Sequence, residues 1–93
     1  MARRAESLRV RGRVQGVGYR WWTVRTASDL GLEGWVRNRR DGTVEILAIG
    51  EAAAIDALQE SCRQGPTAAV VLAVERYMAD DDGSRGFEER PKV

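Results

Sequence analysis

One segment, LRVRGRVQGVGYRWWTVRTASDLGL (residues 8–32), combines a strand pattern, a glycine-rich turn and a helix pattern. Residues 8–14 alternate between apolar or small side chains and arginines, which is the two-residue period of a half-exposed strand. After an interruption at residues 15–19, residues 20–30 are predicted to form a helix that Gly31 ends in the left-handed conformation. A strand should therefore lead through a tight turn into a helix.

The rest of the chain is predicted to form five further elements. In order, they are two strands, a helix and two more strands, at residues 32–38, 43–49, 51–63, 69–78 and 86–90. Asp41 and Gly42 lie between the first two of these strands, and this dipeptide is a strong hairpin signal, so the two strands should pair antiparallel. The predicted helix has an apolar stripe at helical spacing, formed by Ile55, Leu58 and Cys62.

The order of these elements is β-α-β-β-α-β with an additional edge strand. That order is typical of the ferredoxin-like split β-α-β sandwich, an α+β fold in which two helices cover one face of an antiparallel sheet. The last strand should be weak, because Glu89 stands where a second apolar side chain is expected. A chain of 93 residues suits one hydrophobic core, so we expect residues 1–93 to form a single domain, with flexible ends at about 1–6 and 91–93.

Composition excludes several classes of chemistry. The sequence has no histidine, so it cannot build a histidine base, a Ser-His or Cys-His nucleophilic pair, or a histidine metal site. Its single cysteine, Cys62, excludes internal disulfides and multi-cysteine metal sites. The longest apolar run, residues 68–74, is far shorter than the roughly 20 residues of a membrane helix. Without a signal-peptide pattern either, we expect a cytoplasmic protein, and a monomer.

Charge is distributed unevenly along the chain. Residues 1–40 contain ten arginines and three carboxylates, for a net charge of +7, whereas residues 41–93 carry a net charge of −6. If the protein binds an anion, the first forty residues should bind it.

A candidate anion site lies within those residues. Gly12, Gly16 and Gly18 stand between the first strand and the helix, and Arg20 follows at the helix start. Glycines let backbone N–H groups turn toward a ligand, and a helix N-terminus adds unpaired donors and the positive end of its dipole. The spacing matches neither the Walker nor the dinucleotide-binding loop. Phosphate binding and a purely structural turn both account for this pattern.

Two longer motifs make the sequence resemble a known family. The motifs are VRGRVQGVGYR at residues 10–20 and LGLEGWVRNRRDGTVE at residues 30–45, and the resemblance extends from about Leu8 to Phe87. Both closely resemble the signature segments of the acylphosphatase family. The resemblance implies the split β-α-β fold and a small enzyme that hydrolyses the carboxyl-phosphate mixed anhydride without a metal or a covalent intermediate.

At matching positions the resemblance implies two catalytic residues and a substrate-binding loop. The catalytic residues are Arg20, which would bind the phosphoryl group, and Asn38, which would position the attacking water. The loop that would hold the phosphoryl group consists of Gln15, Gly16, Val17, Gly18 and Tyr19. The expected partner is a small-molecule acyl phosphate, with no metal, cofactor, nucleic acid or membrane.

The chemistry of acyl phosphates agrees with these residue types. The leaving group is a carboxylate, whose conjugate acid titrates near pH ~4, so no general acid is needed at neutral pH. Phosphoryl transfer depends mainly on positioning and on donors that face the developing charge. A neutral carboxamide such as that of Asn38 can orient a water molecule but cannot take its proton.

Competing interpretations stay open at this point. Asn38 also suits the start of the hairpin turn, because asparagine is a common turn former. Ferredoxin-like sheets can present aromatics to single-stranded RNA, but Trp21 and Trp22 fall on the predicted helix rather than on a central strand. A sensor that keeps the anion cradle without turnover is a third alternative, which an assay for phosphate release would separate.

Overall fold

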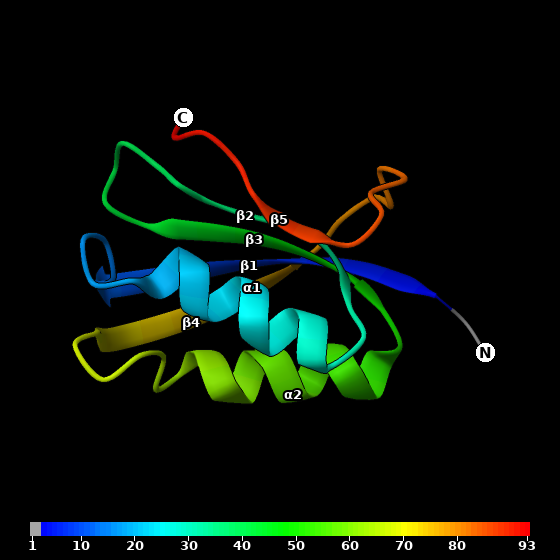
Figure 1. Ribbon diagram of the computed structural model, residues 1–93, viewed down its shortest axis with the longest axis horizontal. Coiled ribbons are helices and arrows are strands. Elements are labelled where there is room, and N and C mark those ends of the chain that lie inside the picture. The colour runs from blue at the N-terminus through cyan, green and yellow to red at the C-terminus, as the bar shows by residue number, and fades with distance from the viewer. Residues whose placement is uncertain (1–2) are drawn as a thin grey trace.

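A five-stranded sheet with two helices on one face makes up the computed structural model, which describes residues 3–93 (Figure 1). The elements, in chain order, are β1 (Arg4–Arg13), α1 (Tyr19–Asp29), β2 (Glu33–Asn38), β3 (Val44–Gly50), α2 (Ala52–Cys62), β4 (Val70–Met78) and β5 (Phe87–Glu89). Every predicted element is present. The largest difference is in β1, which begins four residues before the predicted strand.

The strands lie in the order β4-β1-β3-β2-β5, which is the predicted ferredoxin-like topology with an added edge strand. The β2–β3 hairpin is antiparallel, as predicted, with Asn38 opposite Val44. The expected antiparallel arrangement has one exception, because β5 pairs parallel with β2. β4 runs antiparallel to β2. Residues 79–86 lead the chain from the end of β4 across the sheet to its opposite edge. β5 therefore runs back antiparallel to β4, which makes it parallel to β2.

The main core lies between the sheet and the helices. The sheet contributes Leu8, Val10, Val36, Val44, Ile46 and Ala48. The α2 helix buries the predicted stripe of Ile55, Leu58 and Cys62. The α1 helix buries Tyr19, Thr23 and Ala27. Tyr19 can be buried because its hydroxyl donates a hydrogen bond to the backbone carbonyl of Cys62 at 2.7 Å.

The end of α1 confirms the predicted role of Gly31. Gly31 has a φ of 74°, its N–H donates to the carbonyl of Ser28, and the N–H of Leu32 donates to the carbonyl of Ala27. These two bonds form a Schellman motif, which turns the chain directly into β2. The α1 and α2 helices have eleven residues each, so within residues 3–93 no helix could cross a bilayer.

Alkylation of the native protein should leave Cys62 unmodified and activity intact. Its thiol is fully buried, and burial raises its pKa to about 12, so the reactive thiolate is scarce at neutral pH. Mass spectrometry after iodoacetamide treatment checks this, with urea-unfolded protein as the control that should label fully. Stoichiometric labelling of protein that is still folded, with loss of activity, would show that this placement is wrong.

Candidate functional site

A pocket of about 120 Å³ lies at the N-terminal end of α1. Its walls come from the loop after β1, the first turn of α1 and the ends of β2 and β5. The lining residues are Val14, Gly16, Gly18, Tyr19, Arg20, Trp21, Asn38 and Glu89. Pockets for drug-sized ligands have about 300–1,000 Å³, so this one suits a small chemical group. The fold therefore brings Arg20 and Asn38, both candidates from the sequence, to one small pocket.

The glycine-rich loop presents backbone rather than side chains to this pocket. Gly16 and Gly18 have φ values of 72° and 81°, in the left-handed region that other residues avoid. Gly18 is the N-cap of α1, and no side chain of the described residues caps that helix. The first N–H groups of a helix have no acceptor within the helix, so they are available to an anion together with the positive end of the dipole.

Two candidate residues of the loop direct their side chains elsewhere. The Tyr19 ring is 1% exposed, and burial, followed by the contact with the Cys62 carbonyl, raises the pKa of its hydroxyl far above the usual value. That hydroxyl stays protonated and bonded in the core, so Tyr19 can serve a ligand through its backbone N–H. Val17 packs against the main core and does not line the pocket.

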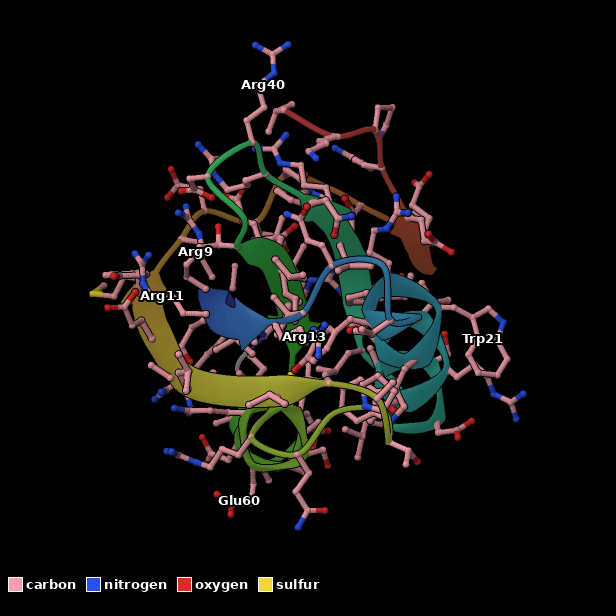
Figure 2. The ribbon with its side chains drawn as sticks, turned by 90° about the vertical axis from the view of Figure 1, so that its left-hand side faces the viewer. Arg9, Arg11, Arg13, Trp21, Arg40 and Glu60 are labelled. Atoms are coloured by element: carbon pink, nitrogen blue, oxygen red, sulfur yellow. The ribbon has the colours of Figure 1, made fainter. Side chains whose placement is uncertain are left out.

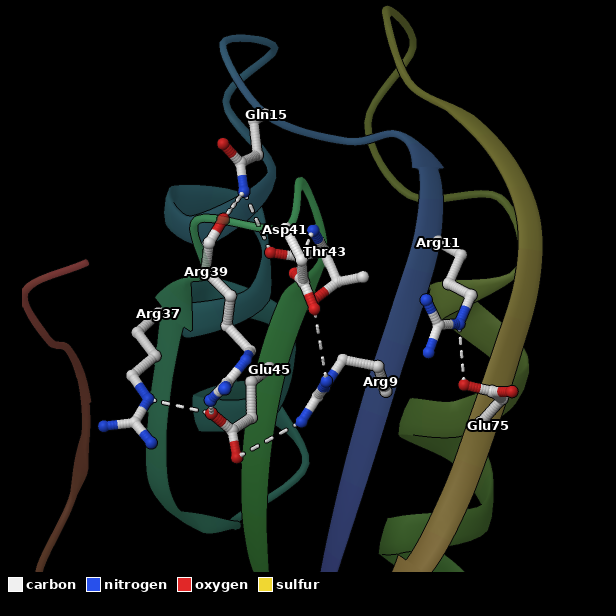
Figure 3. Close-up of polar contacts among 9 residues, drawn as sticks. All are labelled: Arg9, Arg11, Gln15, Arg37, Arg39, Asp41, Thr43, Glu45 and Glu75. Atoms are coloured by element: carbon white, nitrogen blue, oxygen red, sulfur yellow. Dashed lines mark hydrogen bonds and ion pairs between the residues drawn. The ribbon is translucent and has the colours of Figure 1, made fainter. Parts of the chain in front are cut away.

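The side chain of Gln15 ties the loop to the β2–β3 hairpin (Figure 3). Its Nε2 donates to the backbone carbonyls of Arg39 at 2.7 Å and Thr43 at 2.9 Å. Its Oε1 accepts from the Nζ of Lys92 at 3.3 Å. Gln15 is thus a link between the loop and the strand end that carries Asn38, and it does not line the pocket.

Asn38 is the last residue of β2, and it lines the pocket. Its Oδ1 is buried and has no hydrogen-bond partner within residues 3–93. Buried polar atoms in folded proteins are nearly always hydrogen-bonded. Because Asn38 also lines the pocket, its oxygen is available to accept a hydrogen bond from a group that enters it.

Arg20 is the second residue of α1, where a cation opposes the helix dipole. Its Nε lies 3.6 Å from Oε1 of Glu89, and the two side chains are 40% and 43% exposed. The guanidinium therefore stands at the mouth of the pocket with one carboxylate beside it.

A charged cluster on the opposite sheet face steadies the hairpin that carries Asn38 (Figure 3). Glu45 accepts hydrogen bonds from Arg37 Nε at 2.8 Å and from an Arg39 terminal nitrogen at 2.9 Å, and Arg9 lies 3.9 Å away. Burial raises the pKa of Glu45, but the hydrogen bonds from Arg37 and Arg39 outweigh it, so the pKa is lower than usual. Glu45 therefore remains ionised and links both strands of the hairpin.

Glu45→Gln should destabilise the protein by about 1–3 kcal/mol at pH 7, because it removes charge-assisted hydrogen bonds from a half-buried cluster. A lowered pKa in the folded state gives stability above the pKa of the unfolded chain, and that stability is lost as the pH falls. The difference in the free energy of unfolding between Glu45→Gln and wild type should therefore narrow below pH ~4. Urea unfolding at pH 7 and pH 3 measures both effects, with Glu75→Gln as the matched control, because the Glu75 side chain is 40% exposed and, within residues 3–93, forms an ion pair with Arg11 alone. Equal stabilities of Glu45→Gln and wild type at pH 7 would contradict this account.

Three residues of the pocket were not among the sequence candidates: Val14, Trp21 and Glu89. Val14 is a core residue that is 1% exposed. Glu89 interrupts the apolar alternation expected in the last strand, and that interruption was its only signal. Trp21 is 59% exposed and points outward from the start of α1 (Figure 2), and nothing in the helical pattern marks it as part of a pocket.

Comparisons with known proteins agree on one family. The Acylphosphatase family model matches residues 6–89. The acylphosphatase of Rhodospirillum rubrum is 51% identical over 88 residues, covering 92% of this chain and 94% of the relative. That of Nitrobacter hamburgensis is 61% identical over 66 residues, covering 71% and 67%. The solved acylphosphatase of Coxiella burnetii superposes with a TM-score of 0.90 at 34% identity, covering 95% of this chain and 93% of that one.

Proposed function

Because the chain belongs to the acylphosphatase family, whose members are hydrolases that act on acyl phosphates, we propose that its pocket cleaves acyl phosphates by metal-free, in-line attack of water at phosphorus. The products are a carboxylate and inorganic phosphate. One observation carries this proposal: Arg20, in the first turn of α1, and Asn38, at the end of β2, converge on a single small pocket although they belong to different elements of the fold.

In the proposed complex, the loop of residues 15–19 and Arg20 hold the phosphoryl group. Backbone N–H groups of the loop and of the first helical turn donate to its oxygens, and the Arg20 guanidinium donates from the side. Arginine suits this position because its planar fork can make two parallel hydrogen bonds to a phosphate. These donors also face the charge that spreads over the equatorial oxygens in the transition state.

Asn38 orients the attacking water. Its buried Oδ1 accepts a hydrogen bond from the water, which fixes the direction of a lone pair toward phosphorus. The new bond joins the water oxygen to phosphorus, and the bond from phosphorus to the acyl oxygen breaks. The water proton passes to a phosphate oxygen or to solvent, because a carboxamide cannot accept it.

The leaving group explains why these few residues suffice. A carboxylate leaves as an anion at neutral pH, so the step needs no general acid. The sequence has no histidine and one cysteine, and within residues 3–93 there is no cluster of three or more possible metal-ligating side chains. Binding and orientation are the tasks that remain for the protein.

The test is an assay for inorganic phosphate released from a simple acyl phosphate by the purified protein, with and without excess EDTA. The expected result is turnover that EDTA leaves unchanged. Loss of activity in EDTA that a divalent ion restores would overturn the metal-free mechanism. Phosphate binding without any turnover would instead identify a sensor.

A further inference from the structure

Glu89 is an unexpected acid beside the proposed phosphate site. It ends β5 and lies opposite Val36 in the register of β2, two residues after Phe87, which packs against the core below the helices. Because alternate residues of a strand share a face, Glu89 belongs to the face that α1 covers, next to the start of that helix. An acid at the edge of this face, where an apolar side chain would bury more surface, calls for an explanation.

The partner of Glu89 is Arg20. Their closest atoms are 3.6 Å apart, both side chains are more than a third exposed, and both line the pocket. Ion pairs between exposed side chains are weak. Such a pair can neutralise a cation that stands at the unfavourable end of a helix dipole, and a stronger anion can still displace it.

We propose that Glu89 is an exchangeable counter-anion for Arg20, which the phosphoryl group displaces on binding and which pairs with Arg20 again as inorganic phosphate leaves. This inference rests on the proposed function of the pocket as a phosphoryl site. Glu89 and the phosphoryl group are both anions, so they compete for one guanidinium and repel each other across the pocket. Glu89 therefore weakens ground-state binding and assists product release.

The neighbouring charges do not cancel this effect. Arg90 lies 4.0 Å from Asp82 and stacks on the Trp35 ring, on the opposite side of β5. Glu88, the residue before Glu89, pairs in register with Trp35 and so faces away from the helices. Glu88 is thus a matched control, with the same charge on the same strand but on the other face.

The experiment compares Glu89→Gln with Glu88→Gln by calorimetric titration of inorganic phosphate and by steady-state kinetics. Glu89→Gln should bind phosphate about three- to tenfold more tightly than wild type, because one like charge and one competing ion pair are removed. KM for an acyl phosphate should fall by a similar factor, whereas kcat should not rise. Glu88→Gln should stay within about twofold of wild type in both measurements.

Each outcome decides the question. If wild type binds phosphate but Glu89→Gln binds no better than Glu88→Gln, Glu89 is not a competitor, and the proposed function of the pocket survives. Weaker binding by Glu89→Gln would mean that Glu89 holds Arg20 in place, which also overturns the inference. If wild type binds no phosphate, the pocket assignment fails first and this inference fails with it. Glu89→Asp keeps the charge but draws the carboxylate back, so its affinity for inorganic phosphate should lie between those of wild type and Glu89→Gln.

Discussion

Arg20→Ala should lose both turnover and inhibition by inorganic phosphate. The change removes the one guanidinium that lines the pocket within residues 3–93, and it leaves the carboxylate of Glu89 there without its partner, so an incoming phosphoryl group meets net repulsion. We expect kcat/KM to fall by about 10³-fold or more, which is the scale of losing a main transition-state donor. Arg20→Lys should recover little, because an ammonium cannot reproduce a two-pronged contact.

Calorimetric titration of phosphate measures the binding part of this prediction, after circular dichroism confirms that each variant is folded. Arg13→Ala is the charge-matched control: Arg13 is exposed at the end of β1 near the loop (Figure 2) and does not line the pocket. Its phosphate affinity should stay close to that of wild type. If Arg20→Ala bound phosphate as tightly as wild type, the assignment of the loop as a phosphate site would be wrong.

Asn38→Ala should lose turnover but keep its affinity for phosphate, unlike Arg20→Ala. Its phosphate affinity should be nearly unchanged, because Asn38 is proposed to contact the water rather than the phosphoryl group. Its kcat should fall by about 10²-fold or more, as expected when an interaction used mainly in the transition state is removed. The contrast with Arg20→Ala separates a residue that binds from a residue that orients.

Steady-state kinetics and the same phosphate titration test this second prediction. Arg40→Ala is a suitable control, because Arg40 lies in the same hairpin loop and its side chain points away from the rest of the molecule (Figure 2). A kcat of Asn38→Ala close to that of wild type would remove Asn38 from the mechanism.

Local patterns in the sequence were sufficient to predict most of the fold. The Asp41-Gly42 turn, the helix end at Gly31 and the buried stripe of α2 all depend on residues within a few positions of each other. The parallel pairing of β5 with β2 depends on which edge of the sheet the chain has reached, and no local pattern contains that information. The burial of Tyr19 likewise depends on a carbonyl 43 residues away.

The candidate site likewise has some features that local sequence predicts and others that depend on residues distant in the chain. The spacing of the glycines and Arg20 between a strand and a helix was enough to propose an anion site, with a structural turn as the alternative. The hydrogen bonds of Gln15 to the hairpin, and the pairing of Arg20 with Glu89, join residues that are distant in sequence. The sequence marked Glu89 as out of place, but its position beside Arg20 becomes visible only when β5 is paired with β2.

The most direct test of the account is to let the enzyme hydrolyse an acyl phosphate in water enriched in ¹⁸O and to locate the label by mass spectrometry. Attack of water at phosphorus, within a pocket that holds the phosphoryl group, predicts ¹⁸O in the inorganic phosphate and none in the carboxylate. Label in the carboxylate would show attack at the acyl carbon. That result would contradict the roles proposed for the loop, Arg20 and Asn38 together.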